Sequence, residues 1–365
     1  MTVPLTLPLT DRTALRRRVA ALTDDRPGTY RMLDRAGRVI YVGKAKRLRA
    51  RLLSYFRASS PSEKAGRILD ATHDIQWDGA PSEFAAQLAE LRQIRQYHPL
   101  FNVRMNRPRR VAFVKVAGGP APKIYVGASP GTDDVRHYGP LPSPARTREA
   151  IRVLNDLLGL RDCALDMPIV FPEQGDLFGG PARAGCMRHS LGTCTGPCAG
   201  FVAKPAYRAR VEVAVAFLEG RGAAPLDTVV AEMVTASDTN AFERATRWRD
   251  RFEALEWLFA ECNGARAAIE GLSFVYLDPG PYGDDRAYVI KRATVRASAP
   301  GPRTPIEREA FRALVAEHAG PEPGAGPLPV SAIDEVLLLL SWFRRHPAAL
   351  RRTVPLDAWL AHDGL

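Results

Sequence analysis

Residues 26–56 read RPGTYRMLDRAGRVIYVGKAKRLRARLLSYF. Two short runs rich in aromatic and β-branched residues, 28–33 and 39–42, flank a turn containing Asp and Gly. This pattern predicts an antiparallel β-hairpin. Residues 44–56 follow and are strongly basic, with apolar side chains at helical spacing on one face, so they predict a helix.

The flanking sequence predicts the rest of a small domain. Residues 75–77 predict a third short strand, and residues 82–97 predict a helix with Ser82 as its N-cap. A helical lead-in, residues 1–25, precedes the hairpin. We therefore expect an α+β domain over residues 26–108, with an antiparallel sheet and flanking helices.

The charge of the chain is concentrated around this domain. The 365 residues carry a formal net charge of +11. Residues 1–110 hold 22 Lys and Arg against 10 Asp and Glu, whereas the remainder is almost neutral. Codon bias can explain the preference for Arg over Lys, but not an excess confined to one segment. The excess predicts a polyanionic partner, most simply nucleic acid.

Composition excludes several classes of protein. An apolar content of 46% and a charged content of 25% are those of a globular protein. The longest apolar run, residues 336–340, is far shorter than a membrane span of about 20 residues. The N-terminal arginines follow the apolar residues, which is the reverse of a secretory signal. We therefore expect a cytoplasmic protein with no membrane partner.

The predicted domain carries a set of side chains suited to phosphodiester cleavage: Tyr30, Tyr41, Lys44, Arg51 and Glu90. A carboxylate can bind Mg²⁺ or Mn²⁺, and an arginine can clamp phosphate oxygens. A phenol whose proton is drawn off by a nearby cation can deprotonate a water. Each residue taken alone is more often a packing or surface residue. Only the combination predicts a nuclease.

Gly28-Thr29-Tyr30 and Tyr41-Val42-Gly43 resemble the paired signature of the GIY-YIG nucleases, and the longer run to residue 56 resembles the N-terminal nuclease of the UvrC family. The likeness continues at Glu90 and at residues 98–103. It implies an α+β GIY-YIG fold, a general-base role for Tyr30 and a metal ligand in Glu90. It also implies incision of DNA on the 3′ side of a lesion. The remaining site residues that it implies would line the phosphate or support the site: Tyr41, Lys44, Arg51, Tyr55 and Asn102.

Residues 111–225 predict a second α+β region with a cluster of cysteines. The odd number of cysteines and the lack of a signal argue against disulfides. Cys262 is interpreted as a core residue. The other four suit zinc or an iron–sulfur cluster, and their spacing does not choose between them. Here too the sequence resembles UvrC, which implies a 4Fe-4S cluster. These four cysteines are Cys163, Cys186, Cys194 and Cys198.

Residues 226–260 have the pattern of amphipathic helices and could simply be part of a bundle. They resemble, however, the UVR motif through which UvrC contacts UvrB, which implies a partner-binding helical hairpin. The residues that carry this likeness are Met233, Phe242, Glu243, Ala245, Arg249 and Asp250.

Residues 265–365 predict a small α/β region with no function that can be read from the sequence. They show neither a second, RNase H-like nuclease nor a helix-hairpin-helix pair, so we expect a single-nuclease homologue that resembles Cho. Three hypotheses follow. The chain is an endonuclease that UvrB loads, after UvrA, onto damaged double-stranded DNA; or a stand-alone nuclease for branched or foreign DNA; or a non-catalytic regulator that binds DNA or UvrB. The complete set of nuclease residues argues against the third.

Overall fold

The structure is a computed structural model that describes residues 12–22, 25–57, 64–103, 111–129, 135–174, 186–320 and 329–361. The chain divides into two compact units. The first combines Met1–Arg107 with Leu272–Pro321 and Asp334–Leu365, and the second contains Pro108–Gly271 and Glu322–Ile333. The chain therefore leaves the first unit, builds most of the second, and returns to the first.

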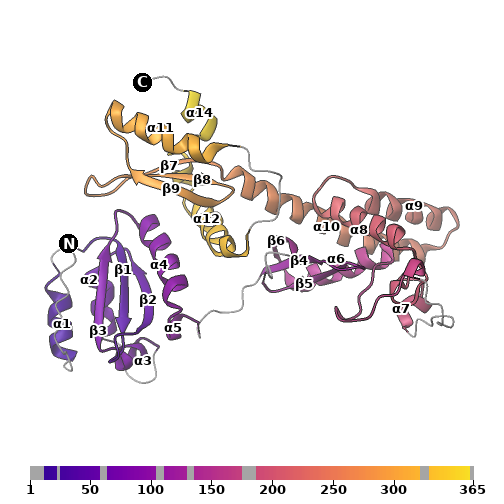
Figure 1. Cartoon of the computed structure of the whole chain (residues 1–365), viewed down its shortest axis with the longest axis horizontal. Coiled ribbons are helices and arrows are strands. Elements are labelled where there is room, and N and C mark those ends of the chain that lie inside the picture. Colours follow the sequence, from indigo (N-terminus) through magenta and orange to yellow (C-terminus); the bar gives the residue numbers. More distant parts are fainter. Residues whose placement is uncertain are drawn as a thin grey trace. The chain divides into compact units, whose positions relative to one another are not determined.

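The N-terminal part of the first unit is a three-stranded antiparallel sheet flanked by helices (Figure 1). Its strand order is β2-β1-β3, so β2 is an edge strand. The strands are β1 (Gly28–Leu33), β2 (Val39–Ala45) and β3 (Asp74–Gly79). The helices are α1 (Arg12–Ala20), α2 (Leu48–Tyr55), α3 (Lys64–Ala71), α4 (Glu83–Tyr97) and α5 (Leu100–Val103). The predicted α+β domain is confirmed.

One boundary in this part was predicted wrongly. The basic helix begins at Leu48 rather than at Lys44, because β2 continues to pair with β1 through Thr29↔Lys44 and Gly28↔Ala45. Lys44 therefore lies on the edge strand and not on the helix. The prediction for α4 is confirmed, because the Ser82 hydroxyl accepts a hydrogen bond from the backbone N–H of Ala85 at 2.9 Å, as an N-cap does.

The second unit packs a three-stranded antiparallel sheet, of order β5-β4-β6, with long helices around one apolar core. Its strands are β4 (Val111–Ala117), β5 (Lys123–Gly127) and β6 (Arg136–Pro142). Its helices are α6 (Pro144–Leu158), α7 (Met187–Ser190), α8 (Lys204–Leu218), α9 (Ala224–Asp238) and α10 (Phe242–Gly271), with 3-10 turns η1 (Pro172–Gln174) and η2 (Pro197–Ala199).

Helices α9 and α10 form a helical hairpin at the place predicted for residues 226–260. Asn240, with a φ of 53°, forms the left-handed turn between them, a conformation that Asn tolerates well. Helix α10 continues to Gly271, well beyond the predicted end of the hairpin. The C-terminal region consequently begins at residue 272 instead of 265.

The C-terminal region is a four-stranded sheet of order β10-β7-β8-β9 with helices (Figure 1). All of its strand pairs are antiparallel, so the region is α+β and the predicted α/β class was wrong. Its strands are β7 (Phe274–Asp278), β8 (Arg286–Lys291), β9 (Thr294–Pro300) and β10 (Thr353–Pro355). Its helices are α11 (Pro305–Ala319), α12 (Ile333–Arg345), α13 (Pro347–Leu350) and α14 (Leu356–Ala361), with the 3-10 turn η3 (Val330–Ala332) before α12. Across the described part of the chain, no helix is long and apolar enough to cross a membrane.

Candidate active site

The β1–β2 hairpin and α2 bring three tyrosines together. The ring centroids of Tyr30, Tyr41 and Tyr55 lie 5.9 to 6.4 Å from one another. Gly43 faces Tyr30 across the β1–β2 ladder, and a Cβ atom there would lie 2.5 Å from the Tyr30 hydroxyl oxygen. Glycine is therefore required at position 43, because a larger residue would displace the Tyr30 ring.

Arg51 joins two of these phenols into one polar group. The Tyr30 and Tyr55 hydroxyls share a hydrogen bond of 2.9 Å, and the Arg51 guanidinium donates to both at 3.3 and 3.4 Å. Tyr30 is only 1% exposed, and burial raises its pKa to about 12, although the charge of Arg51 opposes that rise. Burial also raises the pKa of Tyr55. Both phenols are therefore neutral at pH 7.

Lys44 and Glu90 form a second polar group. The Lys44 Nζ lies 3.5 Å from the Glu90 Oε2, which joins the edge strand β2 to the middle of α4. Burial raises the pKa of the Glu90 carboxyl, and Lys44 compensates this in part. Side chains alternate between the faces of a strand, so Lys44 points away from the face of Gly43 and Tyr30. Among the described residues, no hydrogen bond or ion pair links this second group to the tyrosine–arginine group.

Asn102 supports the edge strand. Its side-chain carbonyl accepts from the Val42 N–H at 2.8 Å, and its amide donates to the Val42 carbonyl at 2.9 Å. Both outward-facing backbone groups of Val42 are thus satisfied. The structure places Asn102 as a positioning residue for β2, because both ends of its side chain are committed to the backbone.

The second polar group fits a hard divalent cation. Within the described ranges, no group of three or more His, Cys, Asp or Glu side chains could hold a metal ion. Mg²⁺, however, keeps several waters and is commonly bound by one or two carboxylates together with substrate phosphates. Glu90 is a half-buried carboxylate, and burial disfavours its charged form despite Lys44, so a cation beside it would stabilise that charge. The residues present therefore fit such an ion.

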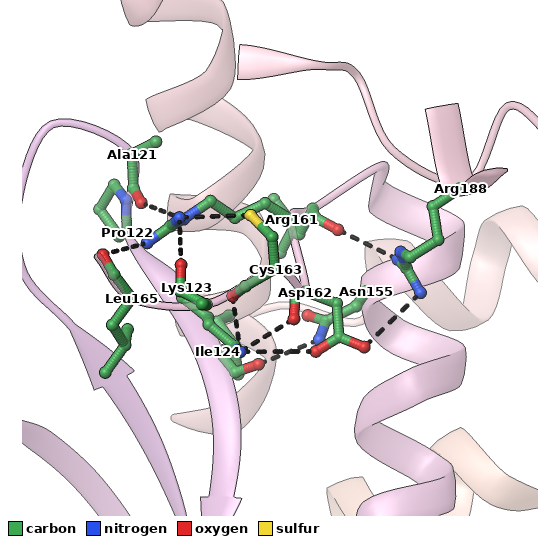
Figure 2. Close-up of polar contacts among 12 residues, drawn as sticks. Ala121, Pro122, Lys123, Ile124, Asn155, Arg161, Asp162, Cys163, Leu165 and Arg188 are labelled. Atoms are coloured by element: carbon green, nitrogen blue, oxygen red, sulfur yellow. Dashed lines mark hydrogen bonds and ion pairs between the residues drawn. The ribbon is translucent and has the colours of Figure 1, made fainter. Parts of the chain in front are cut away.

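The cysteine region is built around a buried arginine (Figure 2). Arg161 is 4% exposed, and its guanidinium donates to the carbonyls of Ala121 and Ala164 and to the Cys163 sulfur, the last at 3.4 Å. Lys123 donates to the Cys163 carbonyl at 2.8 Å. These contacts fix the loop that carries Cys163. This role of Arg161 was not predicted from the sequence, where its only signal is its position two residues before a cysteine.

The other three cysteines of the cluster lie in different surroundings. Cys186 is exposed, Cys194 is buried and Cys198 is intermediate. Burial raises the pKa of both the Cys194 and the Cys198 thiols, and the neighbouring cysteines add to the rise. The described residues contain no group of three or more ligands arranged to hold a metal, so metal binding here stays a prediction. Cys262 lies in the apolar core of the second unit, as predicted.

The predicted partner-binding residues lie on the α9–α10 hairpin, and most are accessible. Phe242, at the start of α10, is 67% exposed, and Val234 on α9 is also exposed. An exposed aromatic residue at the tip of a hairpin is available to a partner. Four of the predicted residues, Phe242, Glu243, Arg249 and Asp250, are exposed, whereas Met233 and Ala245 are partly buried.

Residues 26–103 match the family model of the UvrC-like GIY-YIG domain, and residues 111–217 match that of the UvrC/Cho excinuclease middle domain. The chain thus carries a GIY-YIG nuclease domain joined to an excinuclease middle domain. Over these two domains the chain is similar to the UvrC family.

Similar proteins include UvrABC system protein C of Alkalilimnicola ehrlichii, which is 34% identical over 241 residues, 65% of this chain and 37% of that protein. The corresponding protein of Cronobacter sakazakii is 31% identical over 68% of this chain and 40% of that protein. This chain therefore spans well under half the length of these relatives. The magnesium-bound N-terminal endonuclease domain of UvrC from Thermotoga maritima is 32% identical, with a TM-score of 0.23, and covers 25% of this chain and 99% of that domain.

Proposed function

We propose that this chain is a divalent-metal-dependent DNA endonuclease of nucleotide excision repair, which cuts the damaged strand on the 3′ side of the lesion. The observation that carries the proposal is the tyrosine–arginine group of Tyr30, Tyr55 and Arg51 beside the edge strand, whose Lys44 pairs with Glu90 of α4. A phosphodiester lying along the β2 edge would meet both groups. The net positive charge of the first 110 residues supports binding of the DNA backbone without selection of sequence.

The proposed reaction is hydrolysis of one phosphodiester bond by water. Tyr30 first loses its proton to solvent, and the ionised form is a small fraction at pH 7 because the phenol pKa is about 12. The water oxygen then attacks phosphorus, the water proton passes to the Tyr30 oxygen, one ester P–O bond breaks, and the departing sugar oxygen takes a proton from solvent. Arg51 donates to Tyr30, which favours the ionised phenol, and its remaining N–H groups are suited to phosphate oxygens. Lys44 adds positive charge at the strand edge. Glu90 would hold Mg²⁺ or Mn²⁺, which when bound supplies charge that stabilises the developing negative charge.

A mapped incision assay tests this proposal. A duplex with one defined lesion is incubated with the chain, UvrA, UvrB and magnesium, and the cut positions are read from labelled strands. We expect a single cut on the 3′ side, lost in the Tyr30→Phe and Glu90→Ala variants. Matched controls are Tyr97→Phe and Glu83→Ala, an exposed phenol and a carboxylate of the first turn of α4. Unchanged cutting by Y30F and E90A would refute the site, and cutting of undamaged branched DNA without UvrB would favour the stand-alone nuclease.

The hairpin of α9 and α10 is the proposed contact with UvrB. The exposed Phe242 and the exposed charged residues Glu243, Arg249 and Asp250 supply an apolar centre with a polar surround, which is the usual composition of a small protein interface. The near-neutral charge beyond residue 110 also favours a protein partner over DNA in this part of the chain.

The four clustered cysteines are the proposed ligands of a 4Fe-4S cluster, with zinc as the alternative. Four thiolates match either metal, and the fixed loop of Cys163 supports a ready-made ligand position. Anaerobic purification followed by absorbance and metal analysis separates the two. A brown protein containing iron supports the cluster, whereas a colourless protein with stoichiometric zinc would replace it.

A further inference from the structure

The C-terminal region contacts α4 of the nuclease domain near both ends of that helix. Both belong to the same compact unit, although about 170 residues of chain separate them. Helix α4 carries Glu90, the proposed metal ligand. The contacts of this helix therefore bear on the position of that carboxylate.

At the N-terminal end of α4, one hydroxyl serves two partners. The Ser82 oxygen accepts from the Ala85 N–H as the N-cap of the helix, and the same hydroxyl donates to the Asp278 carboxylate at the end of β7. The Tyr276 hydroxyl donates to the other Asp278 oxygen at 3.1 Å. The helix start is thus hydrogen-bonded to a buried carboxylate of the C-terminal region.

Two residues further on, Phe84 is enclosed by aromatic rings of the C-terminal region. Its ring centroid lies 5.0 to 5.2 Å from those of Tyr276, Tyr288 and Trp342, and 6.3 Å from that of Phe343. Two of these pairs are edge-to-face arrangements, which aromatic rings favour. Phe84 is 0% exposed.

The C-terminal end of α4 is held by charge. The Arg95 guanidinium lies 3.9 Å from Asp334 and 4.0 Å from Glu335, both on α12. Arg26, just before β1, forms an ion pair with Asp284 and stacks over Tyr282 at 4.8 Å. The C-terminal region therefore meets the nuclease domain at three separate points.

These contacts lie along one face of α4, and the proposed metal ligand lies on another. Phe84 and Arg95 are separated by about three full helical turns, so they share a face. Glu90, six positions after Phe84, points elsewhere and pairs with Lys44 of β2. The C-terminal region covers the back of the helix whose other side carries Glu90.

We propose that the C-terminal region is a brace that holds α4 and thereby positions the Glu90 carboxylate for the divalent cation. Phe343 and Asp278 act in this role as positioning residues and touch neither DNA nor metal. The inference rests on the proposed function of Glu90. It assigns a role to the part of the chain that lies beyond both family matches.

Two buried phenylalanines of the C-terminal region allow a matched test in the full chain. Phe343 is 4% exposed and packs on Phe84, Phe274 and Tyr276, whereas Phe311 is 3% exposed and packs on Trp359. Phe343→Ala and Phe311→Ala remove the same ring from similarly buried sites. Mn²⁺ affinity is measured by electron paramagnetic resonance without DNA, and exchange of the α4 backbone amides by hydrogen–deuterium exchange. The Phe343→Leu variant is a milder substitution at the same position and is measured in case F343A does not fold.

We expect F343A to weaken Mn²⁺ binding about ten-fold, as loss of an outer-shell support does, and to speed amide exchange in α4. F311A should leave both unchanged, and F343L should lie between F343A and the wild type. The brace proposal is overturned if F343A, F343L and wild type bind Mn²⁺ with equal affinity. If Glu90→Ala loses binding in the same experiment, the proposed metal site still holds. Undiminished Mn²⁺ binding by E90A would overturn the proposed metal site, and the brace with it.

Discussion

The substitution Asp278→Asn removes a titrating group from the contact between the C-terminal region and α4 while keeping its shape. Asp278 is 4% exposed and accepts from Ser82 and Tyr276. Burial raises its pKa from 3.8 to about 6. The two hydrogen bonds and the charge of Arg352 oppose this rise, and Asp285 adds to it.

The direction in which the free energy of unfolding changes with pH follows from proton binding at Asp278. Between pH 3.8 and about 6 the folded chain binds more protons at Asp278 than the unfolded chain does, so its free energy of unfolding falls as pH rises through this window. The difference in pKa corresponds to about 3 kcal/mol in full, of which the wild type loses about 2 kcal/mol between about pH 4.5 and pH 7.5. Asn does not titrate. The stability of D278N relative to wild type should therefore increase by about 2 kcal/mol over this range and level off above it.

Hydrogen exchange of the β7 and α4 amides, measured from pH 4.5 to 7.5, reports the stability of the first unit separately from that of the second unit. Other titrating groups are common to both proteins, so they cancel in the difference between them. Replacing the Asp278 carboxylate by an amide also changes the hydrogen bonds to Ser82 and Tyr276. That change adds the same amount to the stability difference at every pH, so the dependence of the difference on pH is unaffected. A difference that stays within about 0.5 kcal/mol across this range would refute the assignment of a raised Asp278 pKa.

Three further predictions concern the other sites. Tyr30→Phe should slow incision at least about 100-fold and flatten the rise of rate with pH, because a phenol of pKa about 12 must lose its proton to act; a wild-type rate independent of pH between 7 and 9 would contradict this. Arg161→Leu should lower the stability of the second unit to urea by about 3 kcal/mol, since several buried acceptors lose their donor; an unchanged midpoint would contradict it. Phe242→Ala should weaken UvrB binding in calorimetry by at least about 1 kcal/mol without lowering the melting temperature, and equal affinity would remove the hairpin tip from the interface.

The sequence could predict those parts of the fold that depend on neighbouring residues. The hairpin of β1 and β2 follows from local alternation and turn chemistry, and the Ser82 cap follows from its place before an apolar stripe. The extension of β2 to Ala45 could not be predicted in this way. It depends on pairing with Gly28, and the basic composition around Lys44 is compatible with either strand or helix.

The site was predictable to the extent that its residues form a known chemical set, but their environments were not. Nothing local to Tyr30 indicates that its hydroxyl is enclosed by Tyr55 and Arg51, where burial raises its pKa to about 12. Likewise, Ser82 and Asp278 are 196 positions apart, and no pattern in either segment indicates their contact. Such partners become visible only once the topology brings β7 to α4.

The division of the chain into units has a physical consequence for how the nuclease is built. The sequence likeness to the compared relatives covers about two thirds of the chain, and the family matches end at residue 217. The nuclease domain, however, belongs to one unit with residues that follow Leu272. Without those residues, Phe84 would lose four aromatic neighbours and expose its ring to water, and the Ser82 cap would lose Asp278. A boundary drawn by similarity would therefore cut through the packing of α4, the helix that carries Glu90.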